Sequence, residues 1–339
     1  MRGDMFLFDN VVHAFDLTSE NVAGSRVNSG HDHADLVERL AGSYASRLNA
    51  KNPVIKGTAI TPERAYEYLF ENSEIDMAVA QTVPLFAYFK DGFSPAARNY
   101  DLARAYPQRF VFCGGVDPLW QGVDAAIDEL ERQHAEWGAS SYKFYQTQYD
   151  RTWRADDEKF AYPLYERCLK LGVKNVQFHK GIPFAFENIE DLRPNDLQKA
   201  ARDFPDMTFV IHHLGMPYVD ETMNIAGRFS NIWVALSGWV NAYPLMPYEC
   251  LHALGKALML VGADRLLWGT ESFLSAAVQP WVELFATVQI PEELQDKCGY
   301  PPITAEDRRK MFGLNQARLL GIDVPRKVAQ LYGGAAAAE

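Results

Sequence analysis

The sequence predicts an α/β protein built as a single (β/α)8 barrel of the TIM type. Eight apolar runs have the length of strands, and they are residues 5–12, 75–83, 109–115, 140–145, 175–179, 207–212, 232–236 and 265–269. Segments with helical periodicity lie between most of these runs. From the second run onward the starts recur about every 24 to 35 residues, the length of a strand, a loop and a helix. Eight such units favour a closed barrel over an open sheet.

Several segments between the runs begin as helices do. Residues 61–64, Thr-Pro-Glu-Arg, supply an N-cap, a proline at the first helical position and an acid in the first turn. Helices are also expected at residues 123–137, 195–203 and 276–288. Residues 304–322 are expected to add one or two helices that cover the outside of the barrel.

The loop after the first strand is expected to carry an insertion. About 60 residues separate the first two runs, against roughly 30 elsewhere, and a helix is expected near residues 36–48. The loop contains His31-Asp32-His33. Because this loop lies on the same face of the barrel as His13, His31 and His33 are candidate metal ligands. The alternative is that Asp32 caps the following helix and both histidines face solvent.

Length and composition limit the classes of protein that this chain can be. Its 339 residues, 48% of them apolar, can bury the core of one barrel domain, expected at residues 1–332 and followed by a disordered tail at 333–339. A formal charge of -11 excludes a basic face for nucleic acid. The sequence has no run near the roughly 20 apolar residues of a membrane helix. Its four cysteines show no paired spacing, which favours the cytoplasm.

Histidines and carboxylates follow the ends of several strand runs. The carboxyl ends of barrel strands meet at one mouth, so these side chains are expected to converge there. Imidazole nitrogens and carboxylate oxygens are ligands of zinc, manganese and iron, so the sequence predicts a metal-dependent enzyme. The candidate ligands of this group are Asp9, His13, His179, His212, His213 and Glu271.

The order of these motifs resembles the amidohydrolase superfamily. The resemblance is to its amidohydrolase-related branch, which includes aminocarboxymuconate semialdehyde decarboxylase and resorcylate decarboxylases. It covers most of the chain and is carried by Phe8-Asp-Asn-Val-Val-His13, Phe178-His179-Lys-Gly, Ile211-His-His-Leu-Gly215, Leu267-Trp-Gly-Thr-Glu271 and the C-terminal segment 309–321.

The resemblance implies a function and roles for particular residues. The expected reaction is hydrolysis of a C–N, ester or lactone bond, or non-oxidative decarboxylation, of a small carboxylate-bearing substrate. His13, His179 and Glu271 are expected to hold a divalent ion of zinc, manganese or iron. The expected catalytic residues are His213, as acid or base, and Glu271. Relatives commonly associate, so a homo-oligomer, or a hetero-oligomer with a homologous subunit, is expected.

The chain departs from the family pattern at three places. Val11 stands where the first histidine of the opening pair falls, and Glu271 stands where an aspartate is usual. Asp9 is a candidate replacement, because alternate residues of a strand share one face. The third place is the His212-His213 pair, where one histidine is usual. Motif position favours His213 as the residue that enters the site, and His212 remains an alternative. Only one of the two can face the barrel interior unless the strand is ending, because neighbouring strand residues face opposite sides.

These departures resemble the dinuclear iron or iron/manganese oxygenases of the branch, so one or two ions per chain are expected. Such a hydroxylase component would act on a small organic acid or amine and would need a reductase or ferredoxin. A third alternative is a catalytically silent partner subunit, whose mark would be a barrel without metal. The candidate substrate-binding residues are Lys143, Tyr145, Lys180 and Trp239. Lys143 is expected to bind a substrate carboxylate or pair with an acid more often than to carry a bridging carbamate.

Overall fold

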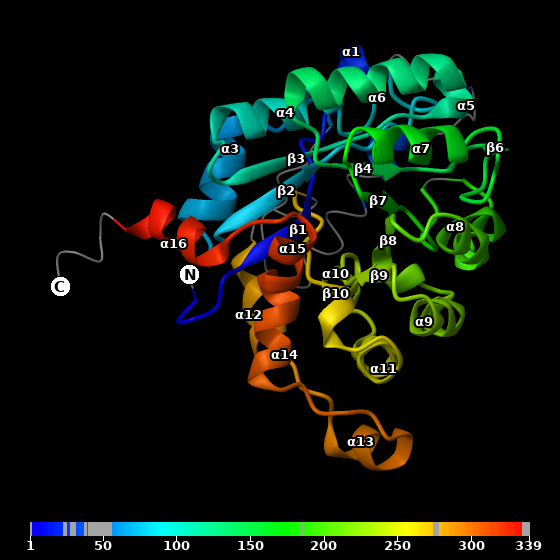
Figure 1. Cartoon of the computed structure of the whole chain (residues 1–339). Coiled ribbons are helices and arrows are strands. Elements are labelled where there is room, and N and C mark those ends of the chain that lie inside the picture. Colours follow the sequence, from blue (N-terminus) through cyan, green and yellow to red (C-terminus); the bar gives the residue numbers. More distant parts are fainter. Residues whose placement is uncertain are drawn as a thin grey trace.

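Eight parallel strands form the centre of the protein (Figure 1). The computed structural model describes residues 2–22, 26–27, 32–36, 39, 56–184, 186–273 and 278–333. The strands, in the order in which they neighbour one another, are β1 (Phe8–Val12), β2 (Met77–Gln81), β3 (Phe110–Gly114), β4 (Ser141–Phe144), β7 (Asn175–Phe178), β8 (Thr208–Ile211), β9 (Ile232–Ala235) and β10 (Leu266–Leu267). All eight expected strands are present.

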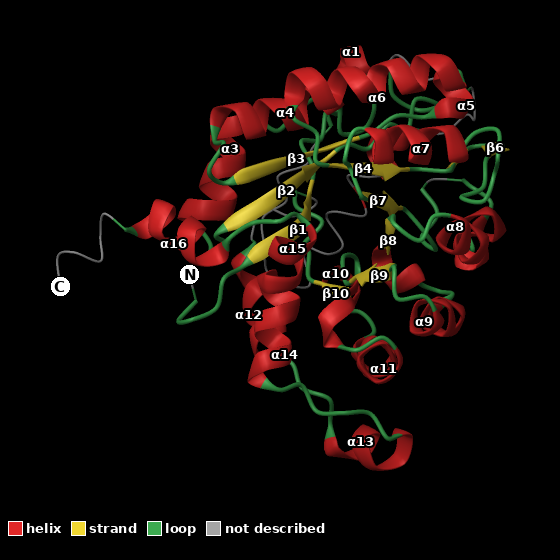
Figure 2. Ribbon diagram, in the orientation of Figure 1, coloured by secondary structure: helices red, strands yellow, loops and turns green. Residues whose placement is uncertain are grey.

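Backbone hydrogen bonds join the last strand to the first. The Asn10 N–H donates to the Trp268 carbonyl at 3.0 Å, and the His13 N–H donates to the Ser272 carbonyl at 2.6 Å. Helices surround the strands (Figure 2). The predicted (β/α)8 barrel is therefore confirmed.

The outer layer consists mainly of helices that follow the strands. Those up to β8 are α1 (Ser19–Val22), α3 (Pro62–Tyr66), η1 (Glu67–Glu71), α4 (Ala96–Ala105), α5 (Pro118–Gln121), α6 (Val123–Trp137), α7 (Tyr162–Lys170), η2 (Ile189–Leu192), η3 (Pro194–Asp196) and α8 (Leu197–Asp203). Those after β8 are η4 (His212–Gly215), α9 (Val219–Arg228), α10 (Trp239–Ala242), α11 (Pro247–Leu260), η5 (Ala263–Arg265), α12 (Gln279–Thr287), α13 (Glu292–Cys298), α14 (Ala305–Arg309), η6 (Lys310–Leu314), α15 (Asn315–Leu319) and α16 (Val324–Tyr332). Within the described segments, no helix has both the length and the apolar character to span a bilayer.

Local sequence explains where the helices begin and end. Thr61 caps α3, as expected, by accepting a hydrogen bond from the Arg64 N–H. The α6 helix occupies the predicted residues and buries Ala126 and Leu130 against the barrel. It ends at Gly138, which has a φ of 68° that glycine adopts without strain. Of the helix expected near residues 36–48, the structure describes residues 36 and 39, both helical, and the tail after Gly333 lies outside the described residues.

Two elements were not anticipated. A small antiparallel hairpin, β5 (Thr147–Gln148) with β6 (Arg151–Thr152), follows β4. The α16 helix extends the C-terminal region beyond residue 322 and packs its apolar side chains near Phe6, Phe8 and Met77. Its Tyr332 hydroxyl donates to Asp76, which directly precedes β2. The last helix therefore covers the amino ends of the first strands.

Candidate metal centre

His13 and Glu271 meet at the carboxyl ends of β1 and β10. The Nδ1 atom of His13 lies 2.8 Å from the Gln81 carbonyl, and its Nε2 atom lies 3.2 Å from Glu271 Oε2. His13 is 1% exposed and Glu271 is 8% exposed. The carbonyl fixes the ring so that Nε2 faces the carboxylate, which is how a backbone carbonyl orients a metal-binding histidine.

His179 and His213 continue this arrangement from β7 and β8. His213 Nε2 lies 2.9 Å from His179 Nδ1. The other ring nitrogens face backbone carbonyls: His213 Nδ1 is 3.2 Å from the Ser237 carbonyl, and His179 Nε2 is 2.5 Å from the Ile182 carbonyl. His213 Nδ1 also lies 3.6 Å from Glu271 Oε1. The four side chains therefore form one continuous chain of contacts at the barrel mouth.

Two ring nitrogens of the cluster face each other without a proton between them. In neutral His179 and His213 the single N–H of each ring donates to a backbone carbonyl, from His179 Nε2 to Ile182 and from His213 Nδ1 to Ser237. The 2.9 Å contact between His213 Nε2 and His179 Nδ1 therefore brings two unshared electron pairs together. A cation bound by these nitrogens would remove that repulsion.

Burial opposes the alternative, in which the imidazoles take up extra protons. It lowers the pKa of His213 to about 4, against the attraction of Glu271. It also lowers the pKa of His179 well below the ordinary histidine value, and His213 adds to this effect. Burial would raise the pKa of Glu271, but the attraction of His213 and the hydrogen bond to His13 outweigh it and hold that pKa well below its usual range. At neutral pH His179 and His213 are therefore neutral and the Glu271 carboxylate is ionised.

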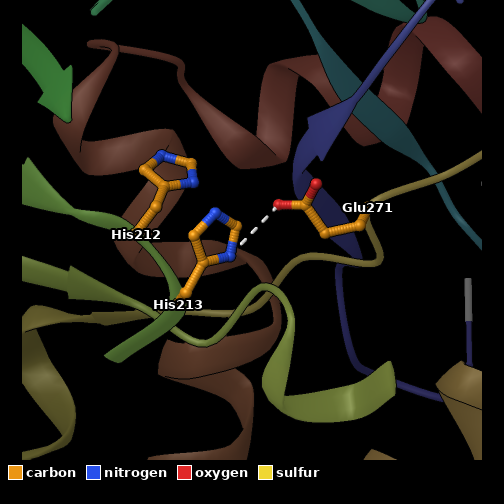
Figure 3. Close-up of side chains that lie close together, drawn as sticks. All are labelled: His212, His213 and Glu271. Carbon is orange, nitrogen blue, oxygen red and sulfur yellow. Dashed lines mark ion pairs between the residues drawn. The ribbon is translucent and has the colours of Figure 1, made fainter. Parts of the chain in front are cut away.

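Both histidines of the His212-His213 pair reach the mouth. β8 ends at Ile211, and the next four residues form a tight turn in which His213 has a φ of 61°. The alternation of a strand has therefore stopped before His213, and neither ring is turned away. His212, His213 and Glu271 each offer a ligand atom within 4.8 Å of the others (Figure 3). His212 Nε2 lies 2.6 Å from Gln177 Oε1, and Nδ1 lies 3.1 Å from Ser237 Oγ.

Among the described residues, the buried polar atoms without a hydrogen-bond partner include Glu271 Oε1 and Lys143 Nζ at the barrel mouth. Lys143 is fully buried, and its Nζ lies 5.5 Å from the centre of the Tyr145 ring. Burial lowers the pKa of Lys143 to about 7, although the charge of Glu271 acts in the opposite direction. Unsatisfied buried groups of opposite charge indicate a site built for something that binds between them.

The Asp9 carboxylate is hydrogen-bonded to Thr270 and Val11. Asp9 Oδ2 accepts a hydrogen bond from Thr270 Oγ1 at 2.5 Å, and Oδ1 accepts from the Val11 and Thr270 N–H groups, each at 3.0 Å. The register of β1 shifts between Asp9 and Val12, so the regular alternation from which residues 9, 11 and 13 were expected to share a face is interrupted there. Burial raises the pKa of Asp9 to about 7.

The remaining candidates are engaged in other contacts. His33 packs on Tyr88, with ring centres 4.3 Å apart, while His31 lies outside the described residues. Tyr145 stacks on His179 with ring centres 4.6 Å apart. Lys180 and Trp239 are fully buried. Lys180 Nζ forms an ion pair with Asp196 at 2.7 Å, and Trp239 Nε1 donates to the Cys250 carbonyl at 2.7 Å.

Polar residues that the sequence did not single out support the cluster. Gln81 Nε2 donates to Gln177 Oε1 at 2.9 Å, and the same oxygen contacts His212. Ser237 contacts both His212 and His213, and Thr270 holds Asp9. The available signal was a glutamine at or near the end of a strand, Gln81 in Met77–Gln81 and Gln177 in Asn175–Phe178.

A closed barrel with histidines and a carboxylate converging at its mouth defines the class of (β/α)8-barrel enzymes with a histidine-rich site that can hold a metal. The chain belongs to the amidohydrolase family, whose model matches residues 53–322. This confirms the family indicated by the sequence motifs and the expectation of an enzyme.

Individual proteins of known sequence or structure resemble the chain to different extents. Protein fluG of Emericella nidulans is 27% identical over 99 residues, which are 29% of this chain and 11% of that protein. The chain thus matches only a small part of that curated relative. An uncharacterised TIM-barrel protein from Bordetella bronchiseptica has a TM-score of 0.69 at 19% identity, covering 94% of this chain and 99% of that one.

Two named enzymes share the fold. A dihydroxybenzoic acid decarboxylase from a Polaromonas species, solved with bound manganese and an inhibitor, has a TM-score of 0.59 at 14% identity and covers 94% of this chain and 97% of its own. A probable 2-pyrone-4,6-dicarboxylic acid hydrolase from Acinetobacter baumannii, with citric acid bound, has a TM-score of 0.56 at 12% identity and covers 94% and 100%. At these identities the likeness establishes the fold.

Proposed function

We propose that the chain is a metal-dependent enzyme that hydrolyses or non-oxidatively decarboxylates a small carboxylate-bearing molecule. The observation that carries the proposal is the 2.9 Å contact between His213 Nε2 and His179 Nδ1, which has no proton when both rings are neutral, together with the neighbouring contact of His13 with Glu271. Their nitrogens and the Glu271 oxygens are donors that suit zinc, manganese or iron. His13, His179 and Glu271 would hold the ion. When bound, the ion supplies positive charge that orients and polarises a carboxylate or carbonyl group.

Lys143 is the proposed anchor for the substrate carboxylate. Its unpartnered Nζ is buried in the barrel beside residues of the centre, and an ammonium there gains most from an anionic partner because little water competes. Tyr145, stacked on His179, would form an apolar wall next to it. The polar atoms of Lys180 and Trp239 already bond within the protein. The geometry therefore supports Lys143 and Tyr145, rather than these two, as substrate-binding residues.

His213 is the proposed proton-transfer group. It lies between Glu271 and His179, and its lowered pKa leaves it neutral at pH 7, so that it can accept a proton. In hydrolysis it would take the proton of the attacking water. In decarboxylation the bond to the carboxylate carbon breaks and CO2 leaves. His213, after taking up a proton from water, would deliver it to the electron pair left on the substrate carbon.

The described contacts favour one ion over two. Both oxygens of Asp9 accept hydrogen bonds from Thr270, so the carboxylate that a second ion would use is engaged within the described residues. A dinuclear iron or iron/manganese oxygenase is the second candidate, favoured by Val11 and Glu271 at positions where the family pattern has histidine and aspartate. The number and identity of the bound metal ions distinguish the hydrolase or decarboxylase from the oxygenase.

The test is metal content by plasma mass spectrometry after expression with zinc, manganese and iron all available. One ion per chain is expected in the wild type, and a large loss is expected in Glu271→Gln, which keeps the shape but removes the charge. The matched control is Glu292→Gln, since Glu292 is exposed on α13. The loaded protein is then screened with aromatic and aliphatic carboxylates for CO2 release and for hydrolysis products. Two iron-rich ions per chain would replace the proposal by the oxygenase, and a metal-free wild type would indicate the silent subunit.

A further inference from the structure

Glu271 lies beyond the paired residues of β10. β10 contains only Leu266 and Leu267, and it ends four residues before Glu271. Glu271 has a φ of 56°, in the left-handed region that costs a non-glycine residue free energy and persists only where neighbouring contacts enforce it. An isolated bridge between Val12 and Ser272 and the side-chain contacts around it, rather than the β9–β10 ladder, therefore fix this turn.

The Asp9 carboxylate supplies the first of these contacts. Asp9 is fully buried in β1, and three hydrogen bonds reach its two oxygens. Two of the three come from Thr270, through its N–H and its hydroxyl. The residue immediately before Glu271 is therefore held from both its backbone and its side chain.

Ser272 supplies the contact on the other side. Its carbonyl accepts the His13 N–H at 2.6 Å, and its own N–H donates to Thr270 Oγ1 at 3.2 Å. The Thr270 and Ser272 hydroxyls lie 2.8 Å apart. Glu271 is thus bracketed by two residues that are hydrogen-bonded to each other and to β1. Since β1 also carries His13, this arrangement fixes the carboxylate relative to the imidazole that it faces.

We infer that Asp9 is a positioning residue: through Thr270 it fixes the turn that holds Glu271 against His13, and it does not bind the ion itself. The inference rests on the proposed function only in taking Glu271 as a ligand. Residues that orient metal ligands affect metal affinity by about 10- to 100-fold when they are removed. In this role Asp9 orients a metal ligand and does not replace the missing first histidine as a ligand.

Substitutions at Thr270 separate the two roles of Asp9. Thr270→Val keeps the shape of the side chain and removes the hydroxyl, while Thr270→Ser keeps the hydroxyl. Asp9→Asn retains an oxygen for both N–H groups, and its amide can donate to the Thr270 hydroxyl, which can donate in turn to Ser272. Asp9→Ala removes every contact. If Asp9 positions the turn, the hydroxyl and the hydrogen bonds matter, and the negative charge does not.

The experiment measures the Mn2+ dissociation constant of each variant by isothermal titration. We expect a 10- to 100-fold weakening in Thr270→Val and Asp9→Ala, and a change within about 3-fold in Thr270→Ser and Asp9→Asn. Thr147→Val is the control for loss of a buried threonine hydroxyl, because Thr147 is buried in the β5–β6 hairpin and bonds to Thr152. The opposite pattern, in which Asp9→Asn binds Mn2+ much more weakly than the wild type while Thr270→Val binds it normally, would show that Asp9 is a ligand and overturn the inference.

Metal-free crystal structures decide the question independently of ion binding. In the wild type and in Thr270→Ser, Glu271 Oε2 should stay near the 3.2 Å contact with His13 Nε2. In Thr270→Val the turn should shift and this contact should be lost. An unchanged contact in Thr270→Val and Asp9→Ala would refute the positioning role. If the wild type bound no metal, the proposed function would fail, but these structures would still test the inference.

Discussion

Lys143 Nζ and Glu271 Oε1 are both buried at the barrel mouth, and neither has a hydrogen-bond partner in the described part of the chain. Lys180 offers a contrast, because its buried ammonium is paired with Asp196 at 2.7 Å. The same substitution at the two lysines therefore has opposite expected effects on the free energy of unfolding.

Lys143→Met removes a buried group whose hydrogen bonds are unmade, so the metal-free protein should gain about 1–3 kcal/mol. Lys180→Met leaves Asp196 buried without its partner and should cost about 3–5 kcal/mol. Urea denaturation in the presence of a chelator measures both. A loss of stability in Lys143→Met comparable to that in Lys180→Met would mean that a partner compensates the Lys143 ammonium.

Metal binding should stabilise the folded protein, because the ion would bind side chains that only the folded barrel brings together. At a free Mn2+ concentration 100 times the dissociation constant, linkage adds about 2.7 kcal/mol. For a chain of this size that corresponds to a rise in Tm of roughly 5 °C. Differential scanning fluorimetry with and without Mn2+ measures the shift. Glu271→Gln should show little or none of it, and an equal shift in that variant would place the ion elsewhere.

The two kinds of histidine should respond differently to removal. His13→Ala deletes a proposed ligand and should abolish metal binding together with activity. His213→Ala should keep the metal and lower kcat by about 10²- to 10⁴-fold, the usual effect of losing a proton-transfer group. Metal content and kcat, measured on the same preparations with the substrate found by screening, separate the two roles. Loss of metal in His213→Ala would make His213 a ligand.

Stability should fall as pH rises from about 4 to about 7, because burial raises the pKa of Asp9 to about 7. In this range the folded protein holds a proton on Asp9 that the unfolded chain has released. The folded state therefore binds more protons, and each pH unit costs up to about 1.4 kcal/mol. Asp9→Asn is neutral throughout and should lack this component. Urea denaturation of metal-free wild type and Asp9→Asn at several pH values measures the free energy of unfolding of each protein. The same dependence on pH in both proteins would contradict the prediction.

Gly269 is required by the side chain of Val11. A Cβ atom at position 269 would lie 2.7 Å from Val11 Cγ1, which is too close for two carbons. Because Val11 is fully buried, Gly269→Ala should cost about 1–3 kcal/mol of unfolding free energy through overpacking. Adding Val11→Ala should recover part of the loss, since the smaller side chain vacates the space. If the double variant were less stable than the sum of the two single effects, another contact would be responsible.

The strands and most helices could be predicted because their signals are local. Each barrel strand is an apolar run, and Thr61 and Gly138 are caps that are visible in the sequence. The length of β10 was not predictable in this way. Residues 265–269 have the composition of a strand, but only Leu266 and Leu267 pair with β9. The rest of the run turns to contact β1 through tertiary hydrogen bonds.

The candidate centre could be predicted as a set of residues but not as a geometry. His13, His179, His213 and Glu271 were identifiable because each follows the end of a strand. That Asp9 contacts Thr270 depends on a register shift inside β1, which residue composition does not encode. Likewise, His212 and His213 both face the mouth only because the backbone turns at the end of β8.

The position of α16 determines how the protein can be attached to other molecules. Its apolar face packs near Phe8 and Met77, and Tyr332 bonds to Asp76, so the helix sits at the end of the barrel opposite the histidines. An affinity tag, a surface linker or a fluorescent reporter joined after this helix would leave from that end of the barrel. Immobilised protein would then have the end that carries the histidines turned away from the support.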